Sequence, residues 1–434
     1  MQHRLKVKKS SIIHYLLLYL LLLLNGSRIW IVTARRNSTI ATAIQLFIIV
    51  LAFCFMLSKP KKFNFKYSLA ELGLLALFIV FVRFKSGGVG IFSLIEWAAY
   101  LLLAHIIVLY DTKNVMQRFV NIVYVFAAIS IIGYILQIAF PSVLQSILPS
   151  YESNFSAYAG MSGQTILYRA QTAWGRFIFT FDERQITRNV GLFSEPGVYQ
   201  IVLNSALFIL LFMRGTTSFN AKQYRRRLIV LIAALLTSQS VTGYIGFIVL
   251  LLFYVASKQN EQGASGTRRF ITVLGFVILL FVAIDYSIRG TSSLTYNVFL
   301  GRLFNSQGRI DLSVSSGMYR MGTIGTSLQL IVSHPLGMGY DAANNAIQLA
   351  FSGSSGAIIL ITGAALGIIP LLSIIIWTVY PIIHSRLINK AAKIALVFIW
   401  INTALAQSEE FYTGYIIIVL YLLATLKEKK IAGE

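Results

Sequence analysis

Residues 228–256 read LIVLIAALLTSQSVTGYIGFIVLLLFYVA, an apolar run interrupted once, at the polar segment TSQSVTG (237–243). Basic segments flank the run on both sides, RGTTSFNAKQYRRR (214–227) before it and SKQNEQGASGTRR (257–269) after it. Short basic joints mark the cytoplasmic side of a membrane protein, so this run crosses an even number of times. We therefore predict two helices that meet at TSQSVTG near the outer face, each shorter than the roughly 20 residues of an ordinary span. Such short segments belong inside a bundle, often beside a cavity.

The composition of the whole chain agrees with a membrane protein. Of its 434 residues, 57% are hydrophobic and only 12% are charged, whereas a soluble domain has about 25% charged residues. Lys and Arg exceed Asp and Glu by 22, and in a membrane protein this excess reports orientation rather than binding to nucleic acid. Further apolar runs lie at about 39–57, 68–82, 91–109, 119–140, 197–213, 270–288, 356–383, 394–407 and 411–426.

The N-terminus MQHRLKVKKSS leads into LLLYLLLLL (16–24) without a small-residue cleavage site, so we expect an uncleaved first span. With the pair of short helices, the count becomes about twelve spans, and both termini are cytoplasmic. We expect an all-α polytopic membrane protein that forms a single integral membrane domain over residues 1–434.

Two outer segments, 141–196 and 289–355, are too long to be simple connections. In the first, RFIFTFDERQITRNVGLF (176–193) alternates in a way that predicts a short hairpin turning near Asp182 and Glu183. In the second, one helical face carries apolar residues and another carries Arg320, Thr323 and Ser327. The apolar positions are Met318, Met321, Ile324, Leu328 and Ile331. This pattern predicts an amphipathic helix at the membrane surface or over a cavity.

The two outer segments contain arginines but no lysine. The eight arginines are Arg169, Arg176, Arg184, Arg188, Arg289, Arg302, Arg309 and Arg320. A planar guanidinium binds phosphate in a bidentate manner that lysine cannot reproduce, so the set predicts a phosphate or pyrophosphate site. The candidates for this site are Arg188, Arg169, Arg176, Arg184, Arg309 and Arg320. Alternatively, individual arginines pair with nearby carboxylates, as Arg289 does if it forms a helical pair with Asp285.

The stretch RNVGLFSEPG (188–197) joins such an arginine to the start of a span. Ser194 fits a helix N-cap, and Glu195 and Pro196 fit the first turn. Arg188 comes within reach of Glu195 if the chain turns at Gly191. Arg188 then binds a ligand phosphate while Glu195 orients it or acts as a base; the alternative is a buried pair that only fixes the loop.

A second polar stretch, SHPLGMGYDAANN (333–345), supplies two further candidate bases, His334 and Asp341, so that the catalytic candidates are Glu195, His334 and Asp341. Other polar side chains are candidates for lining a cavity: Tyr199, Ser240, Thr242, Tyr340, Asn344 and Glu409. The histidines show no metal-ligand spacing, and no nucleotide or dinucleotide fingerprint occurs, so we expect neither a metal nor a cofactor.

Four stretches occur in an order that resembles a known family. They are RNVGLFSEPGVYQ (188–200), TSQSVTGYIGFIVLLLF (237–253), SHPLGMGYDAANN (333–345) continuing to GAIILITGAALGI (356–368), and AQSEEFYTGYIIIVLYLL (406–423). The chain resembles the bacterial O-antigen and capsular-polysaccharide polymerases (Wzy type), which are related to the O-antigen ligases. The resemblance to the ligases is weaker at one position: they carry a His-Asn pair where this chain has Asn344 and Asn345. This difference favours a polymerase over a ligase.

The resemblance implies a C-type glycosyltransferase (GT-C) fold at the outer face of a bacterial inner membrane. It implies metal-independent, inverting transfer of a growing glycan from undecaprenyl diphosphate to a sugar hydroxyl of an incoming lipid-linked repeat unit. Membrane lipid, a chain-length regulator and a flippase are the partners it implies. The sequence leaves three alternatives: ligase-type glycan transfer, transport of a lipid-linked oligosaccharide, for which short broken helices are typical, and a non-enzymatic subunit of a polysaccharide machine.

Overall fold

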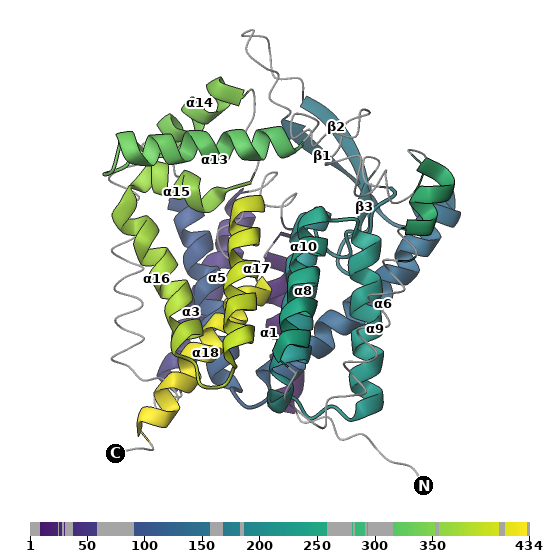
Figure 1. Cartoon of the computed structure of the whole chain (residues 1–434), viewed down its shortest axis with the longest axis horizontal. Helices are drawn as coiled ribbons and strands as arrows, with labels where there is room; N and C mark the ends of the chain where they lie inside the picture. Colours follow the sequence, from purple (N-terminus) through teal and green to yellow (C-terminus); the bar gives the residue numbers. More distant parts are fainter. Residues whose placement is uncertain are drawn as a thin grey trace.

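The structure is a computed structural model, and it describes residues 9–24, 26–27, 30, 38–58, 91–156, 168–182, 186–257, 280, 283–290, 293, 316–351, 356–407 and 413–431. Within these residues the chain is predominantly α-helical, with fourteen α-helices, one short 3-10 helix (Arg214–Thr216) and one three-stranded sheet. Most of the helices form a bundle, and a smaller group of elements covers one end of it (Figure 1).

The bundle contains most of the predicted apolar runs. Its helices are α1 (Lys9–Leu24), α3 (Ser38–Ser58), α5 (Ile91–Tyr110), α6 (Val115–Ala139), α8 (Pro196–Phe212), α9 (Ala221–Ser238), α10 (Val241–Ser257), α16 (Ile368–His384), α17 (Lys390–Ala406) and α18 (Thr413–Ile431). The run predicted at 68–82 and most of the run at 270–288 lie outside the described residues.

The division of residues 228–256 into two helices is confirmed. Helices α9 and α10 have 18 and 17 residues, and Gln239 between them has a left-handed backbone with φ 51°. The hydroxyl of Ser240 accepts a hydrogen bond from the backbone N–H of Gly243 (3.3 Å), which caps the start of α10. Helix α8 packs against both halves of this pair.

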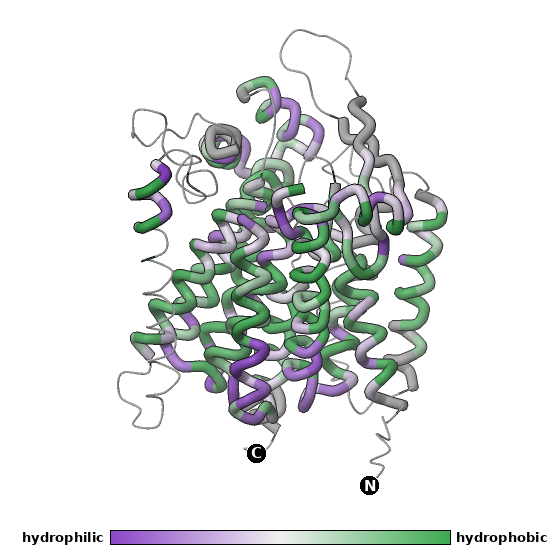
Figure 2. The backbone as a smooth tube through the Cα atoms, turned by 90° about the vertical axis from the view of Figure 1, so that its right-hand side faces the viewer, coloured by the Kyte–Doolittle hydropathy of each residue, from purple (hydrophilic) through white to green (hydrophobic). Residues whose placement is uncertain are grey.

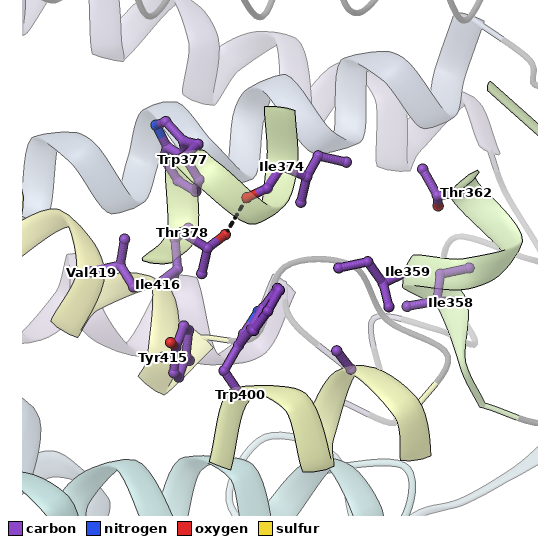
Figure 3. Close-up of a pocket in the computed structure, with 11 residues that line it drawn as sticks. Ile358, Ile359, Thr362, Ile374, Trp377, Thr378, Trp400, Tyr415, Ile416 and Val419 are labelled. Carbon is purple, nitrogen blue, oxygen red and sulfur yellow. Dashed lines mark hydrogen bonds between the residues drawn. The ribbon is translucent and has the colours of Figure 1, made fainter. Parts of the chain in front are cut away.

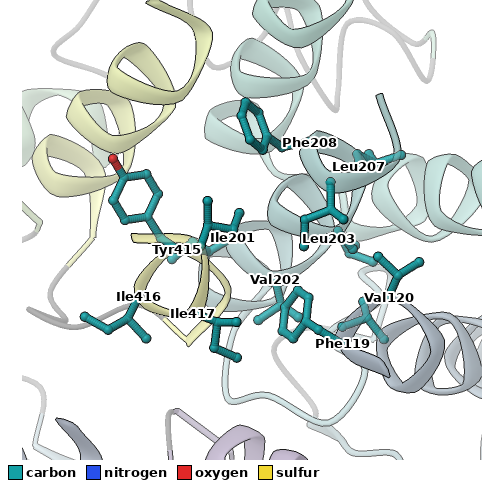
Figure 4. Close-up of a cluster of buried hydrophobic side chains, with 14 of the residues drawn as sticks. Phe119, Val120, Ile201, Val202, Leu203, Leu207, Phe208, Tyr415, Ile416 and Ile417 are labelled. Atoms are coloured by element: carbon teal, nitrogen blue, oxygen red, sulfur yellow. The ribbon is translucent and has the colours of Figure 1, made fainter. Parts of the chain in front are cut away.

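Helix α8 is the centre of the bundle, because its side chains are buried along almost its whole length. Figure 4 shows part of this core, in which Ile201, Leu203 and Phe208 of α8 lie among side chains of α6 and α18. A helix that is apolar on all sides must be enclosed by other helices or by lipid, and here the neighbours are α6, α9, α10, α17 and α18.

One end of the bundle, the basic end, carries most of the described cations. They include Arg118, Arg214, Lys222, Arg225, Arg226, Arg227, Arg386, Lys390 and Lys393. Helix α9 begins there with a capping box between Asn220 and Gln223, and Arg227 donates to the side-chain oxygen of Asn121 (2.7 Å). Helix α1 begins at this end, since Arg118 donates to Ser11 (3.2 Å), and α18 ends there (Figure 1). Figure 2 shows a hydrophobic middle above this hydrophilic end.

The outward sides of the bundle helices are apolar. Phe47 on α3, Ile135 on α6, Leu252 on α10 and Ile376 on α16 are examples of large side chains that are exposed. One helix of the described part of the chain, α6, is both long and apolar enough to cross a membrane, and several apolar helices are shorter than that limit.

The opposite end, the capped end, carries a short helix α7 (Pro141–Ile147) and the strands β1 (Ser150–Ser156), β2 (Tyr168–Trp174) and β3 (Phe181–Asp182). The strands form an antiparallel sheet in the order β1-β2-β3, with Trp174 opposite Phe181. The hairpin predicted within 176–193 is wrong, because Asp182 lies in β3 opposite Ala173; Glu183 lies outside the described residues. The chain turns between Gly175 and Thr180 instead, because Gly175 takes a left-handed backbone (φ 82°) in close contact with Phe179.

A second group at the capped end, the cap layer, consists of α13 (Ser316–Ser333), α14 (Tyr340–Phe351) and α15 (Ile358–Leu366). Helix α13 lies across the end of the bundle, with α14 above it and α15 below it (Figure 1). The expected single span at 356–383 is wrong: Gly367 (φ 99°) divides it into α15, which packs in the cap layer, and α16, which belongs to the bundle. Gly367 breaks the helix because only glycine adopts this backbone without strain.

Candidate functional site

Three of the sequence motifs meet at the capped end, where α9 ends, α8 and α10 begin, and α17 ends. We call this region the junction and define it by Arg188, Asn189, Glu195, Gln239 and Gln407. It brings RNVGLFSEPG, TSQSVTG and the start of AQSEEFY together, although these motifs lie far apart in the sequence.

Asn189 holds the junction together and is fully buried. Its side-chain amide donates to Ser130 of α6 (3.1 Å) and to Thr237 of α9 (2.9 Å), and its side-chain oxygen accepts from the backbone N–H of Gly191 (3.0 Å). Its own backbone N–H donates to the carbonyl of Thr237 (3.0 Å). Asn189 therefore ties the segment before α8 to two helices of the bundle.

Replacement of Asn189 by alanine is expected to destabilise the protein by about 3 kcal/mol, because three side-chain hydrogen bonds of about 1 kcal/mol each are lost from a buried site. The apparent midpoint of thermal unfolding in detergent measures this effect. Asn345→Ala is the matched control, since Asn345 is exposed on α14. Equal midpoints for the two variants would contradict the assigned role of Asn189.

Arg188 is half-buried beside this asparagine. Its Nη2 donates a hydrogen bond to the backbone carbonyl of Gln239 (3.0 Å), the left-handed residue between α9 and α10. The side-chain amide of Gln137 on α6 donates to the carbonyl of Ile186, close to Arg188 in the chain. The hydrogen bond to the backbone carbonyl of Gln239 holds the guanidinium in place at the turn between α9 and α10.

The start of α8 differs by one residue from the prediction. Glu195, rather than Ser194, is the N-cap; Pro196 is the first helical residue, and the Glu195 side chain is exposed. Helix α8 begins at the proline because its fixed φ and missing N–H suit the first helical position. The predicted turn at Gly191 is confirmed, with φ 59°.

Tyr199 is a core residue rather than a cavity residue, which corrects the prediction. It is almost completely buried, and its hydroxyl lies 2.7 Å from Ser130 Oγ. A Cβ at Gly191 would lie 3.0 Å from the Tyr199 ring, so glycine is required for this close packing. Tyr199 thus supports the segment that carries Arg188.

Gln407, which was not among the predicted site residues, is buried at the end of α17. Its side-chain amide packs directly on Gly197 in the first turn of α8, where any Cβ would collide with it. Its backbone carbonyl accepts from the N–H of Ile358, the first residue of α15 (3.4 Å). Gln407 therefore connects the junction to the cap layer. The signal for it is the glycine after SEP, which permits a close contact.

A line of buried and half-buried amides, which were not among the predicted site residues either, runs from the junction into the bundle. Asn204 donates to Gln200 on α8 (2.9 Å) and to the carbonyl of Gly243 on α10 (3.1 Å). Asn402 of α17 donates to the carbonyl of Thr242 (3.0 Å). Together they form a polar seam between α8, α10 and α17. The predicted cavity residues Ser240 and Thr242 are buried where this seam reaches the junction.

The remaining predicted residues that the structure describes lie in the cap layer. Tyr340 is buried, and its hydroxyl lies 3.0 Å from the hydroxyl of Thr362 on α15. His334 and Asp341 are exposed, and His334 Nδ1 lies 2.9 Å from Ser333 Oγ. Asn344 is half-buried on α14. The two candidate bases, His334 and Asp341, thus lie on the surface of the cap layer. Arg188 lies elsewhere, at the turn between α9 and α10.

The predicted arginines are distributed over both groups at the capped end. Arg176 is exposed in the turn between β2 and β3, Arg169 lies in β2 opposite Phe155, and Arg320 is half-buried on α13. Arg289, which we did not place in the site, pairs with Asp285 (3.9 Å) as its spacing predicts. The predicted site residues Arg184, Arg309 and Glu409 lie outside the described residues.

A narrow pocket lies between α15, α16, α17 and α18. Figure 3 shows Trp377, Trp400 and Tyr415 around it, with Ile359 entering from α15. Thr362, which contacts Tyr340, also lines it. The walls are mainly apolar and aromatic, which is typical of a site for a hydrophobic ligand.

Among the described residues, no group of three or more His, Cys, Asp or Glu side chains is arranged to hold a metal ion. Comparison with protein-family models, curated proteins and solved structures finds no match for this chain.

Proposed function

We propose that this chain is a bacterial inner-membrane polysaccharide polymerase with about twelve spans and a GT-C-type fold. It transfers a growing glycan from undecaprenyl diphosphate to the sugar hydroxyl of an incoming undecaprenyl-diphosphate-linked repeat unit. The bond between the anomeric carbon and the phosphate oxygen breaks, and a glycosidic bond to the acceptor oxygen forms with inversion. The acceptor hydroxyl loses its proton, and undecaprenyl diphosphate leaves.

The outward apolar sides of the bundle support a position in the membrane. Soluble monomers rarely expose contiguous apolar patches larger than a few hundred Å², whereas α3, α6, α10 and α16 all expose large aliphatic or aromatic side chains. The basic end fits the cytoplasmic side. The capped end, with the junction and the cap layer, is then at the outer face, and α1 begins and α18 ends in the cytoplasm.

The position of Arg188 is the observation that carries the proposal. Its guanidinium is half-buried and held by the Gln239 carbonyl at the capped end, where the positive-inside rule disfavours cations. A diphosphate is already a good leaving group, so transfer needs stabilisation of its charge more than a general acid. A fixed guanidinium provides that stabilisation without rearrangement during the reaction.

The roles proposed for the other residues of the capped end follow from the role of Arg188. Glu195, exposed at the start of α8, orients Arg188 or guides the acceptor hydroxyl as a weak base, and His334 and Asp341 are the alternative bases. The lining of the pocket beside Trp377, Trp400 and Tyr415 is apolar and aromatic, which matches an isoprenoid chain in polarity. The resemblance described above points to the same reaction.

Purified protein in detergent, supplied with a lipid-diphosphate-linked repeat unit and EDTA, tests the proposal. A ladder of products separated by one repeat unit is expected on a gel without any other protein. In a parallel reaction that also contains lipid A, a single product of glycan transfer to lipid A, with no ladder, would indicate a ligase instead. The absence of both products from well-folded protein would contradict the transferase assignment.

The polar seam between α8, α10 and α17 favours a second candidate, transport of a lipid-linked oligosaccharide. Gln200 Nε2 and Asn204 Oδ1 are buried, with no hydrogen-bond partner within the described part of the chain, and buried polar groups in a bundle mark substrate pathways in transporters. The division of α15 from α16 at Gly367 resembles the broken helices of transport sites. Flux of the lipid-linked oligosaccharide across protein-containing liposomes, without a ladder, would establish this candidate.

A further inference from the structure

Helix α13 turns hydroxyl side chains inward, together with Ile331, and turns several large apolar side chains outward, beside the exposed Gln329 and Ser333. The side chains of Thr323 and Ser327 are both 0% exposed. Val332 on the other side is 81% exposed, and Met321 and Leu328 are about half exposed. A helix on a water-soluble surface shows the reverse arrangement, with hydroxyls in water and aliphatic side chains in the core.

Helix α14 in the same layer shows the ordinary arrangement. Its buried side carries Tyr340, Ala343 and Ile347, and its exposed side carries Asp341 and Asn345, with one large apolar side chain, Leu349, near the end of the helix. The two helices pack against each other. The contrast indicates that α14 faces water and that α13 faces a different, apolar environment.

The exposed side of α13 continues into the exposed side of α16. The backbone N–H of Ile368, at the start of α16, donates to the carbonyl of Pro335 (2.9 Å), which places Leu336 beside the top of that helix. Leu336, Ile369 and Ile376 are all largely exposed. An apolar surface therefore continues from the bundle to α13, with the exposed polar side chains of Gln329, Ser333 and His334 beside it.

We propose that α13 lies in the outer leaflet of the membrane, with Met321, Leu328 and Val332 among the lipid chains near the headgroups. Its polar side, with Arg320, Thr323 and Ser327, then faces the protein and separates the leaflet from the capped end. The partner of this surface is the lipid bilayer itself. The inference rests on the proposed position of the bundle in a membrane, and it adds that the cap layer is partly immersed rather than wholly in water.

Site-directed fluorescence in nanodiscs tests the inference. Cys54 is the sole cysteine of the chain, so Cys54→Ser provides a background for single probes at Val332→Cys on α13, Ile376→Cys on α16 and Ala342→Cys on α14. Each variant is labelled with bimane and quenched either by phospholipid carrying a nitroxide high on its acyl chain or by aqueous iodide. Leu328→Cys serves as a second probe on α13 in case the first does not fold.

The α13 probe is expected to be quenched by lipid nitroxide at least about threefold more strongly than the α14 probe, and only weakly by iodide. Ile376, which is 61% exposed on α16, reports separately on the bundle. If both α13 probes behave like Ala342→Cys while Ile376→Cys is quenched by lipid, α13 lies in water and the inference is overturned. If Ile376→Cys is also quenched only by iodide, the membrane position of the bundle is itself overturned.

Discussion

Arg188→Ala is expected to lower the rate of glycan polymerisation by about 10²- to 10³-fold, the loss typical of removing one fixed donor to a developing anion. In the structure, this guanidinium is held by the carbonyl of Gln239, between two helices of the bundle. The loss therefore removes both the charge and its fixed position. Initial rates of ladder formation from a lipid-diphosphate-linked repeat unit measure the effect.

Two variants separate this chemical role from a structural one. Arg188→Lys keeps a donor for the Gln239 carbonyl, so its thermal stability is expected to match the unmodified protein. It lacks the planar pair of donors that binds a diphosphate, so its rate is expected to fall by about tenfold or more. Arg289→Ala is the matched control, since this arginine is exposed and already pairs with Asp285. Similar rates for Arg188→Ala and Arg289→Ala would contradict the proposed site.

The sequence predicts the elements whose signals are local. The pair α9 and α10 follows from two basic flanks and one polar interruption, and the turn at Gly191 follows from a glycine before a capped helix. Arg188 stands out because arginine replaces lysine throughout the outer segments. These features require only composition, spacing and the preferences of single residues.

The elements that the sequence does not predict depend on contacts between distant segments. Residues 356–383 look like one apolar span, and only the cap layer shows that α15 leaves the bundle at Gly367. Gln407 lies in the stretch AQSEEFY, but its contact with Gly197, more than 200 residues earlier in the chain, cannot be predicted from that stretch. For a similar reason, the sequence does not predict which face of α13 turns inward. Periodicity gives the two faces of a helix but not the environment of each.

The connection between the cap layer and the bundle depends on two glycines in backbone contact. Gly337 (φ 78°) lies against the backbone of Ala365 and Leu366, and Gly367 (φ 99°) lies against Pro335 and Leu336. The backbone N–H of Gly339 donates to the carbonyl of Ala365 (2.9 Å) within the same contact. Here two main chains approach more closely than any Cβ allows, and neither side has a flexible side chain that can move away.

Gly337→Ala is therefore expected to destabilise the protein by about 3 to 5 kcal/mol, the sum of a left-handed backbone strain and an unrelieved backbone collision. The apparent midpoint of thermal unfolding in detergent measures this loss, and the release of α13 and α14 is expected to reduce polymerisation in parallel. Gly325→Ala is the matched control on α13, because a Cβ there meets no atom within 4 Å. Alanine at that helical position is expected to be neutral or to stabilise by about 0.5–1 kcal/mol. A Gly337→Ala variant as stable as Gly325→Ala would show that the cap layer is not locked to the α15–α16 break, and the bundle would then form independently of it.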